Sequence, residues 1–340
     1  MMTTRKSIVF LRKGFLRWNL TAFSLVLIIT AGVPSMRSVA APRQQTGPTP
    51  TPSSTNGLAT LAILGDINLG RGVHPNSKTF TYLEPLLQSA DLAIANLESP
   101  LTTRNVVTKS PFALCTSPEP VHYLSDAGFD LLSFANNHDH DCGVFGFKDT
   151  LATLKQNNLD AIPAGLLPVY REVNGIKLAF LSINATWAFD RAALLMAISS
   201  ARAENAVVVV SIHWGNEYFS QPSKFQKTLA KQMAEAGASL IWGTHPHVLQ
   251  PVEWIDIPCD SRNPAKICRQ TLVMYSLGNA LFDQYALPDT RQSVLALVQL
   301  GKDGVQEFHA IPFVIDERYS RLIAADDATA KKILERLRPK

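Results

Sequence analysis

Residue types that bind metals and activate water recur directly after short apolar runs of this chain. Five clusters of this kind stand where a predicted strand ends: GDINLGR at 65–71, ANLESP at 95–100, NNHDHD at 136–141, HWGNEY at 213–218 and GTHPHV at 243–248. Because the carboxyl ends of parallel strands meet at one edge of a sheet, we expect the five clusters to lie together.

The chemistry of these clusters is that of a divalent metal site. Two carboxylates, Asp66 and Glu98, follow the first two apolar runs, and later runs are followed by the histidines His138, His213, His245 and His247. Carboxylate oxygen and neutral imidazole together suit Mn²⁺, Fe²⁺ or Zn²⁺. A carboxylate that bridges two such ions can position the nucleophile of an in-line displacement at phosphorus. We therefore predict a centre with two ions.

Each of these residues also has a plainer explanation when it is taken alone. A histidine at a strand end is more often an ordinary polar residue than a ligand, and Asp66 after Gly65 fits a turn or a helix cap. Five independent turn or helix caps do not readily explain why all five clusters stand at strand ends. The segment His245-Pro246-His247 is more specific, because proline fixes the backbone and both rings then lie on one side of an extended segment.

Asn137, next to His138, has two roles open to it. Its amide oxygen can be a metal ligand, or its NH₂ group can bind an oxyanion of the substrate. A histidine that binds a metal usually has its second ring nitrogen held by a carboxylate or a carbonyl. Asp141 and Glu217 are near enough in sequence to do this.

Strand-like and helix-like segments alternate through most of the chain, which predicts an α/β core with both sheet faces covered by helices. The expected strands are 58–64, 91–95, 129–135, 176–183, 206–212, 238–242, 271–276, 293–300 and 305–315. The expected helices are 82–90, 118–128, 143–158, 191–205, 222–236 and 327–337. The pattern predicts one domain over 58–316 and a helical extension over 317–340.

The N-terminal segment has the layout of a secretory signal, with basic residues before an apolar run at 20–33 and small residues at 38–40. We expect a cleaved signal peptide over 1–40; the alternative is an uncleaved membrane anchor. Residues 41–57, rich in Pro, Thr and Ser, predict a disordered linker. The domain is then exported, and lies in the extracellular space, in the periplasm or on the outer face of the cytoplasmic membrane.

Composition and cysteine content agree with an exported globular protein. Of the 340 residues 46% are hydrophobic, and the formal charge of +4 is too small to indicate nucleic acid as a partner. Exported chains can keep disulfides. Cys259 and Cys268 flank a polar loop and are the expected pair. Pairing of Cys115 with Cys142 is the weaker expectation, because Cys142 lies in the Asn-Asn-His segment and could stay a free thiol.

At these residues the chain resembles the capsule-synthesis CapA family, exported proteins associated with poly-γ-glutamate capsules and distantly similar to calcineurin-like metallophosphoesterases. The matching stretches are GDINLGR, ANLESPLT, ANNHDHDCGVFGFKDTLATL, HWGNEY, residues 221–253 and YSLGNALFD at 275–283. The resemblance implies a four-layer α/β/β/α sandwich of metallophosphatase-like type, with two sheets between helices. Two positions depart from the wider superfamily: Asn68 stands where a histidine is usual, and Glu98 lies in Asn-Leu-Glu instead of Gly-Asp.

The residues and the resemblance together define an expected site. The expected metal ligands are Asp66, Glu98, Asn137, His213, His245 and His247, and the expected catalytic residues are Asn137, His138, His213 and Glu217. Substrate contacts are expected from Asn68, Arg71, Asn96, Asn136, Asp141, Trp214 and Asn279.

Two functions of different kinds fit these features. The first is a metal-dependent hydrolase or transferase that acts on a phosphoester or on a polymer linkage such as the γ-glutamyl bond. The second is a non-enzymatic export or assembly factor that binds an anionic exopolymer in the same cleft. Membrane-bound polymer synthesis machinery is a candidate partner in both cases.

Overall fold

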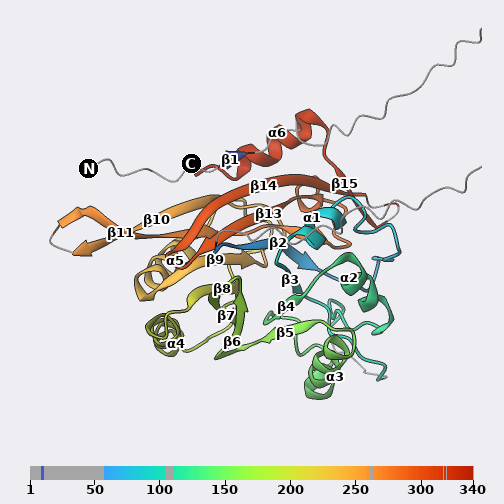
Figure 1. The fold of residues 1–340 in the computed structure, drawn as a ribbon. Helices are drawn as coiled ribbons and strands as arrows, with labels where there is room; N and C mark the ends of the chain where they lie inside the picture. Colours follow the sequence, from blue (N-terminus) through green and yellow to red (C-terminus); the bar gives the residue numbers. More distant parts are fainter. Residues whose placement is uncertain are drawn as a thin grey trace, which may run out of the picture.

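The computed structural model describes residues 9–10, 57–104, 110–260, 263–316, 318 and 320–339. Two sheets lie face to face, and helices cover the outer face of each (Figure 1). One hydrophobic core fills the space between the sheets, and two further cores lie between each sheet and its helices. The predicted four-layer α/β/β/α sandwich is therefore confirmed.

The larger sheet has the order β1-β14-β13-β2-β3-β4-β5, with β12 beside β2 and β15 beside β14. Its strands β2, β3, β4 and β5 are parallel, and β12 is parallel to β2. The strands are β1 (Val9–Phe10), β2 (Ala59–Ile67), β3 (Leu92–Leu97), β4 (Leu131–Phe134), β5 (Asp160–Pro163), β12 (Asn279–Leu281), β13 (Gln292–Gly301), β14 (Gly304–Asp316) and β15 (Arg321–Ala324).

The smaller sheet has the order β10-β11-β9-β8-β7-β6. Its central strands β7, β8, β9 and β11 are parallel, and the outer strands β6 and β10 are antiparallel to their neighbours. The strands are β6 (Gly165–Val173), β7 (Ile176–Asn184), β8 (Val207–His213), β9 (Ala238–Thr244), β10 (Val252–Asp260) and β11 (Asn263–Met274). The long hairpin of β10 and β11 extends away from the rest of the molecule (Figure 1).

Helices α1, α2 and α3 pack on the larger sheet, α4 and α5 pack on the smaller sheet, and α6 packs beside β13 and β14. The helices are α1 (Glu84–Ser89), α2 (His122–Ala127), α3 (Gly143–Gln156), α4 (Arg191–Ala203), α5 (Lys224–Ala236) and α6 (Asp327–Arg336), with short 3₁₀ turns η1 (Glu119–Val121) and η2 (Pro288–Arg291). Among the described residues no helix is long and apolar enough to cross a membrane.

The central strands are apolar on both faces, which is why they stand out in the sequence. In β2, Leu61 and Ile63 contribute to the core between the sheets, whereas Ala62 and Leu64 contribute to the core under the helices. Full burial of a leucine or isoleucine side chain stabilises the folded state by about 1.5–3 kcal/mol. The strands that carry the site therefore stand on well-packed layers.

Two glycines next to the site are required by close approach of the backbone. A Cβ atom on Gly65 would lie 1.8 Å from the carbonyl oxygen of Gly278, and a Cβ atom on Gly243 would lie 2.0 Å from that of Tyr275. Only glycine fits at such distances. The ends of β2 and β9 thus both press against the segment after β11, and this brings their polar residues together.

The loop before α5 also has a fixed geometry. Ser223 and Gln226 form a capping box, which satisfies N–H groups that the start of a helix leaves without partners. Gly237, with φ +128°, ends the helix and turns the chain into β9. The sequence therefore fixes both ends of α5, the helix that connects β8 to β9. These two strands carry the histidines of the smaller sheet.

The predicted helices are present with ends shifted by a residue or two, except that α2 begins at His122 instead of 118 and follows the 3₁₀ turn η1. The predicted strands are present as well, although β11 begins at Asn263 instead of 271. Strands β1, β5, β6, β10, β12 and β15 were not predicted, because they are short or lie at edges where few side chains are fully buried. The 317–340 segment, expected to be a helical extension, also contributes β15 to the larger sheet. The expected signal peptide and linker lie outside the described residues, apart from Val9–Phe10 and Gly57.

Candidate metal centre

The clusters predicted from the sequence meet at the carboxyl ends of the parallel strands of both sheets. Asp66 lies in β2, Glu98 follows β3, and the Asn-Asn-His segment follows β4. His213 is the last residue of β8, and the His-Pro-His segment follows β9. The larger sheet thus supplies the carboxylates and the smaller sheet supplies most of the imidazoles.

Glu98 is fully buried and lies at the centre of this group. Its Oε1 atom is 3.7 Å from His247 Nε2, 3.8 Å from His138 Nε2 and 3.9 Å from His213 Nε2. Neither oxygen of Glu98 has a hydrogen-bond partner among the described residues. Glu98 Oε1 and the Nε2 atom of His213 or His247 are close enough to share an ion that binds each of them at about 2.0–2.2 Å. The residues present therefore fit a divalent metal.

Asp66 lies beside Glu98 and is also fully buried. Asn96 Nδ2 donates to Asp66 Oδ1 at 2.8 Å, and the backbone N–H of His245 donates to Oδ2 at 3.1 Å. One ligand atom from each of Asp66, Glu98 and His247 lies within 4.8 Å of the other two. These three residues are one candidate ligand group.

Hydrogen bonds fix the ring of His247. Asn279 Nδ2 donates to the carbonyl of Thr290 at 3.0 Å, which turns Asn279 Oδ1 toward His247 Nδ1 at 2.8 Å. Since an amide oxygen only accepts, His247 carries its proton on Nδ1 and presents the lone pair of Nε2 to Glu98 and the metal site.

His213 and Asn137 face each other across the two sheets. His213 Nε2 is 2.7 Å from Asn137 Oδ1, and His213 Nδ1 is 2.8 Å from Thr244 Oγ1. The ring of His245 lies 4.7 Å from the ring of His213, and its buried Nδ1 has no hydrogen-bond partner among the described residues. Asn137, His213 and His245 therefore lie close together.

His138 is held in a different way and is more accessible. Its Nδ1 is 2.7 Å from Asp141 Oδ2, which also accepts from the backbone N–H of Leu114 at 2.8 Å. The side chain of His138 is 16% exposed, against 1% for His213 and 2% for His247. Asp141 thus performs the orienting role expected from the sequence.

Burial sets the protonation of the site. It raises the pKa of Asp66 to about 7 and, together with the charge of Asp66, raises the pKa of Glu98 well above its usual value. Burial also lowers the pKa of His213 well below its usual value, that of His245 to about 4 and that of His247 to about 3. At neutral pH these three imidazoles are in the form that binds metals, and a bound cation would favour ionisation of both carboxylates.

The His-Pro-His segment is not extended, which corrects the sequence-based expectation. His245 has φ +93° and His247 has φ +58°, in the left-handed region that non-glycine residues rarely adopt. The bond from the His245 amide to Asp66 holds this conformation. Backbone strain of this kind costs about 1–3 kcal/mol per residue and is typical of functional sites.

Residues 60–284 match a family model described as bacterial capsule synthesis protein PGA_cap. The chain belongs to this family. PGA biosynthesis protein CapA of Bacillus subtilis strain 168 is 32% identical over 309 residues, which cover 82% of this chain and 78% of that protein. Capsule biosynthesis protein CapA of Bacillus anthracis is 32% identical over 302 residues, which cover 79% of this chain and 70% of that protein. The solved structure of TT1561 of Thermus thermophilus matches with a TM-score of 0.40 at 10% identity, covering 72% of this chain and 99% of that one.

The whole candidate site lies within the segment that matches the PGA_cap family model. The match includes every expected ligand and ends just after Asp283, whereas β13, β14, β15 and α6 lie beyond it. The resemblance drawn from the motifs is thereby confirmed at the level of the family.

Five residues expected to contact substrate in this PGA_cap protein have no exposed surface. They are Asn68, Asn96, Asn136, Trp214 and Asn279. Asn96 and Asn279 hold Asp66 and His247 as described above, and Asn136 Oδ1 accepts from the backbone N–H of His138 at 3.1 Å. Trp214 is a core residue whose Nε1 donates to the carbonyl of Tyr275 at 2.9 Å. Asn96, Asn136 and Asn279 therefore position other residues of the site.

Arg71 remains accessible at the edge of the site, with 33% of its side chain exposed. Its guanidinium forms two hydrogen bonds to the carboxylate of Asp283 and lies 5.5 Å from the centre of the Phe282 ring. Asp283 also accepts from the backbone N–H of Gly72 at 3.1 Å. Sequence reasoning missed Asp283 as a site residue, although it ends the family-like stretch YSLGNALFD.

Both cysteine pairs form disulfides. Cys259 and Cys268 join the two strands of the β10–β11 hairpin, which is the pair expected from the sequence. Cys115 and Cys142 are also joined, so Cys142 is not the free thiol that the sequence left open. This second disulfide connects the Leu114 segment to the residue that follows Asp141.

Proposed function

We propose that this chain is a divalent-metal-dependent hydrolase or transferase in the synthesis of a bacterial capsule polymer of poly-γ-glutamate type. The observation that carries the proposal is the buried carboxylate of Glu98, which faces three imidazole nitrogens and has no hydrogen-bond partner among the described residues. A buried carboxylate is costly without a nearby cation. A surface that binds polymer without a metal does not require a buried carboxylate of this kind.

The proposed cofactor is a pair of Mn²⁺, Fe²⁺ or Zn²⁺ ions. The residues that would hold it are Asp66, Glu98, Asn137, His213, His245 and His247. Bound divalent ions of this kind polarise a phosphoryl or carbonyl oxygen and lower the pKa of water into the neutral range.

We assign proton transfer to His138. Because Asp141 holds Nδ1, Nε2 is the ring nitrogen that faces the site. The exposure of this side chain allows a substrate to approach it, whereas His213 and His247 are shielded. In the protonated form, Nε2–H delivers the proton that a leaving alkoxide or amine requires.

Arg71 supports an anionic substrate. Its exposed guanidinium is held in place by Asp283, so a substrate carboxylate or phosphate gains a charged hydrogen bond without first ordering a long side chain. An anionic exopolymer or a phosphoester fits this arrangement. The formal charge of +4 gives no reason to propose nucleic acid.

The printed names of the Bacillus relatives, a PGA biosynthesis protein and a capsule biosynthesis protein, support the assignment to capsule polymer synthesis. Membrane-bound polymer synthesis machinery is the partner that this role calls for. The two disulfides support a location outside the cytoplasm, because such bonds persist in oxidising compartments.

The test is a cleavage assay on the purified full chain loaded with Mn²⁺, with a γ-linked oligoglutamate and an aryl phosphodiester as substrates. We expect turnover of at least one substrate and a loss of at least about 100-fold in Glu98→Gln. His138→Ala should impair amide cleavage by about 100-fold or more, and phenolate release less, because phenolate leaves without a proton. The exposed control Glu235→Gln should be unchanged.

A chain that holds metal and binds the oligoglutamate, yet cleaves neither substrate, would contradict the enzymatic proposal. That outcome would favour the non-enzymatic polymer-binding factor. Loss of both metal and polymer binding in Glu98→Gln would then indicate that the polymer carboxylates bind through the metal.

A further inference from the structure

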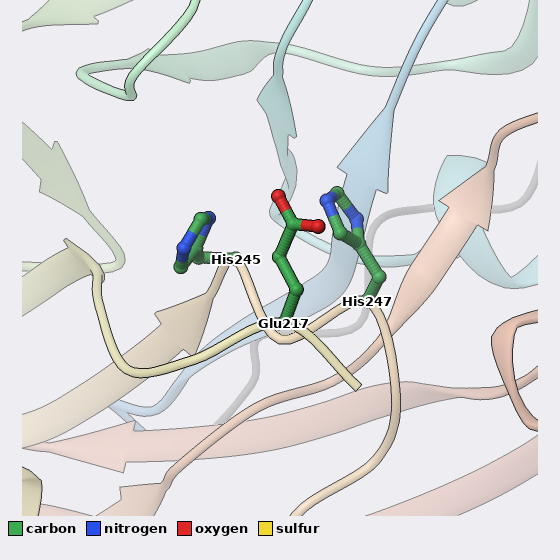
Figure 2. A group of neighbouring side chains, drawn as sticks. All are labelled: Glu217, His245 and His247. Carbon is green, nitrogen blue, oxygen red and sulfur yellow. The ribbon is translucent and has the colours of Figure 1, made fainter. Parts of the chain in front are cut away.

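Glu217 differs from the other candidate ligands because its side chain is exposed. It lies in the loop of residues 214–223, which connects β8 to α5. Figure 2 shows the Glu217 carboxylate between the imidazole rings of His245 and His247. One ligand atom from each of these three residues lies within 4.8 Å of the other two.

Hydrogen bonds hold this loop against the His-Pro-His segment. The backbone N–H of Tyr218 donates to the carbonyl of Pro246 at 2.8 Å, and Gln284 Nε2 donates to the hydroxyl of Tyr218 at 3.1 Å. Gln250 Nε2 donates to the carbonyl of Phe219 at 2.8 Å. Tyr218 has φ +65°, a conformation that an L residue adopts only when its surroundings enforce it. The position of the backbone that carries the neighbouring Glu217 is therefore fixed by the fold.

The ligand group beside Glu217 is incomplete without it. Asn68, two residues after Asp66, closes its own turn: Oδ1 accepts from the backbone N–H of Gly70 at 3.0 Å and Nδ2 donates to its carbonyl at 3.2 Å. Asn68 is thus occupied elsewhere, and Asp66, Glu98 and His247 form a group of three. Ions of this type usually take four or more donors.

Two further observations support Glu217 as a ligand: the charge balance of the centre and a buried ring nitrogen without a partner among the described residues. Two divalent ions carry four positive charges, and Asp66 and Glu98 neutralise two of them, so a third carboxylate reduces the remaining charge. The buried Nδ1 of His245, on the other side of Glu217, has no hydrogen-bond partner among the described residues. A buried ring nitrogen without a partner is explained by a ligand that is directed at it.

We propose that Glu217 is a metal ligand that the 214–223 loop supplies, and that it completes the coordination of the ion at His247 on the solvent side of the centre. The inference rests on the metal centre of the proposed function and extends it. With Glu217, the group of Asp66, Glu98 and His247 would reach four donors.

Isothermal titration with Mn²⁺ and elemental mass spectrometry on the purified full chain test this proposal without an activity assay. The variants are Glu217→Gln, which keeps the size but removes the charge, and Glu217→Asp, which keeps the charge on a shorter side chain. Glu235→Gln, an exposed glutamate of α5, is the matched control. The melting temperature of each metal-free variant is measured alongside.

We expect Glu217→Gln to weaken the binding of one Mn²⁺ by at least about tenfold or to lose that ion, with Glu217→Asp intermediate and the control unchanged. Metal-free melting temperatures should be equal, because Glu217 is exposed. Equal Mn²⁺ stoichiometry and affinity in Glu217→Gln and wild type would overturn the role of Glu217 while leaving the proposed function intact. A wild-type chain that binds no Mn²⁺ would overturn both.

Discussion

The ionised carboxylate of Glu98 is costly to the metal-free protein. It is buried, it faces the charge of Asp66, and its pKa is raised well above the usual value for a glutamate. An acid whose pKa is raised on folding destabilises the folded state once the pH exceeds its unfolded pKa. The free energy that metal binding supplies therefore depends strongly on this residue.

Replacing this charge tests that account. In metal-free protein at pH 8, Glu98→Gln should raise the melting temperature, because each unit of the raised pKa corresponds to about 1.4 kcal/mol that the neutral amide avoids. The same variant should lose most of the rise in melting temperature that Mn²⁺ gives the wild type. Thermal unfolding with and without EDTA measures both effects. A lower melting temperature of the metal-free variant would mean that Glu98 stabilises the fold through contacts of its own.

Proton competition at Asp66 and Glu98 predicts a pH-dependent affinity for metal. Asp66 has a pKa of about 7 and Glu98 a higher one, so both carry protons at pH 6 that a metal must displace. His245 and His247, with pKa values of about 4 and 3, are already neutral and add no dependence in this range. The apparent Kd for Mn²⁺ should fall about tenfold per pH unit for each displaced proton between pH 6 and 7. Calorimetric titrations at pH 6, 7 and 8 measure this, and an affinity independent of pH would contradict it.

The sequence predicts those site residues whose position follows from a local motif, and it does not predict contacts between residues far apart in the chain. Asp66 and the His-Pro-His segment follow strands directly, so residue type and position predict them. The bond between His247 and Asn279, and that between Arg71 and Asp283, join residues 32 and 212 positions apart, and no local pattern encodes them. Trp214 was assigned to the site because it adjoins His213, but successive residues at a strand end point to opposite faces, which buries Trp214 in the core.

At the scale of elements, three serines join the two sheets directly below the site. Ser133 in β4 is 2.6 Å from Ser182 in β7, and Ser211 in β8 donates to Ser133 at 2.9 Å. All three are almost fully buried. The hydroxyl cluster therefore fixes how the strands that carry the Asn-Asn-His segment and His213 face each other.

Ser133→Ala should lower the free energy of unfolding by about 2 kcal/mol, because it leaves two buried hydroxyls without their shared partner. Chemical denaturation measures the loss. Ser89→Ala, at an exposed position at the end of α1, is the control and should change little. Replacing all three serines by alanine should cost less than three times the single change, since no buried hydroxyl is then left unpaired. Equal stabilities of Ser133→Ala and wild type would show that the cluster does not hold the sheets together.

The disulfide between Cys115 and Cys142 acts on the element that carries His138. It joins the Leu114 segment to the start of α3, and Leu114 donates to the same Asp141 that orients His138. The sequence could not favour this pair, because the cysteines are 27 positions apart, with a helix and a strand between them, and no local pattern brings them together.

Removing this pair with Cys115→Ser and Cys142→Ser should cost about 2–4 kcal/mol of stability and lower the rate of any amide cleavage that uses His138. Cys259→Ser with Cys268→Ser is the matched control, because that disulfide staples a hairpin away from the site. Denaturation and cleavage assays on both variants separate the effects. A control that loses as much activity as the first pair would refute the link to His138.

At the scale of the whole molecule, the site lies where the two sheets meet. Asp66, Glu98 and Asn137 come from the larger sheet, and His213, His245 and His247 come from the smaller one. Metal binding therefore requires the two sheets to be packed in their native arrangement. It should stabilise the whole domain as one unit. The alternation of strands and helices predicts the layers, whereas the contact of the two sheets follows from the core residues that they share, such as Ile63 and Phe180.

The metal content of the purified chain tests the central claim most directly. Elemental mass spectrometry is performed on the full chain, prepared without chelator and without a His tag, and on Glu98→Gln and the control Glu235→Gln. The account predicts about two Mn, Fe or Zn ions per wild-type chain and per control chain, and at most about half as many in Glu98→Gln. A wild-type chain that holds no divalent metal, even after incubation with Mn²⁺, Fe²⁺ and Zn²⁺, would contradict it.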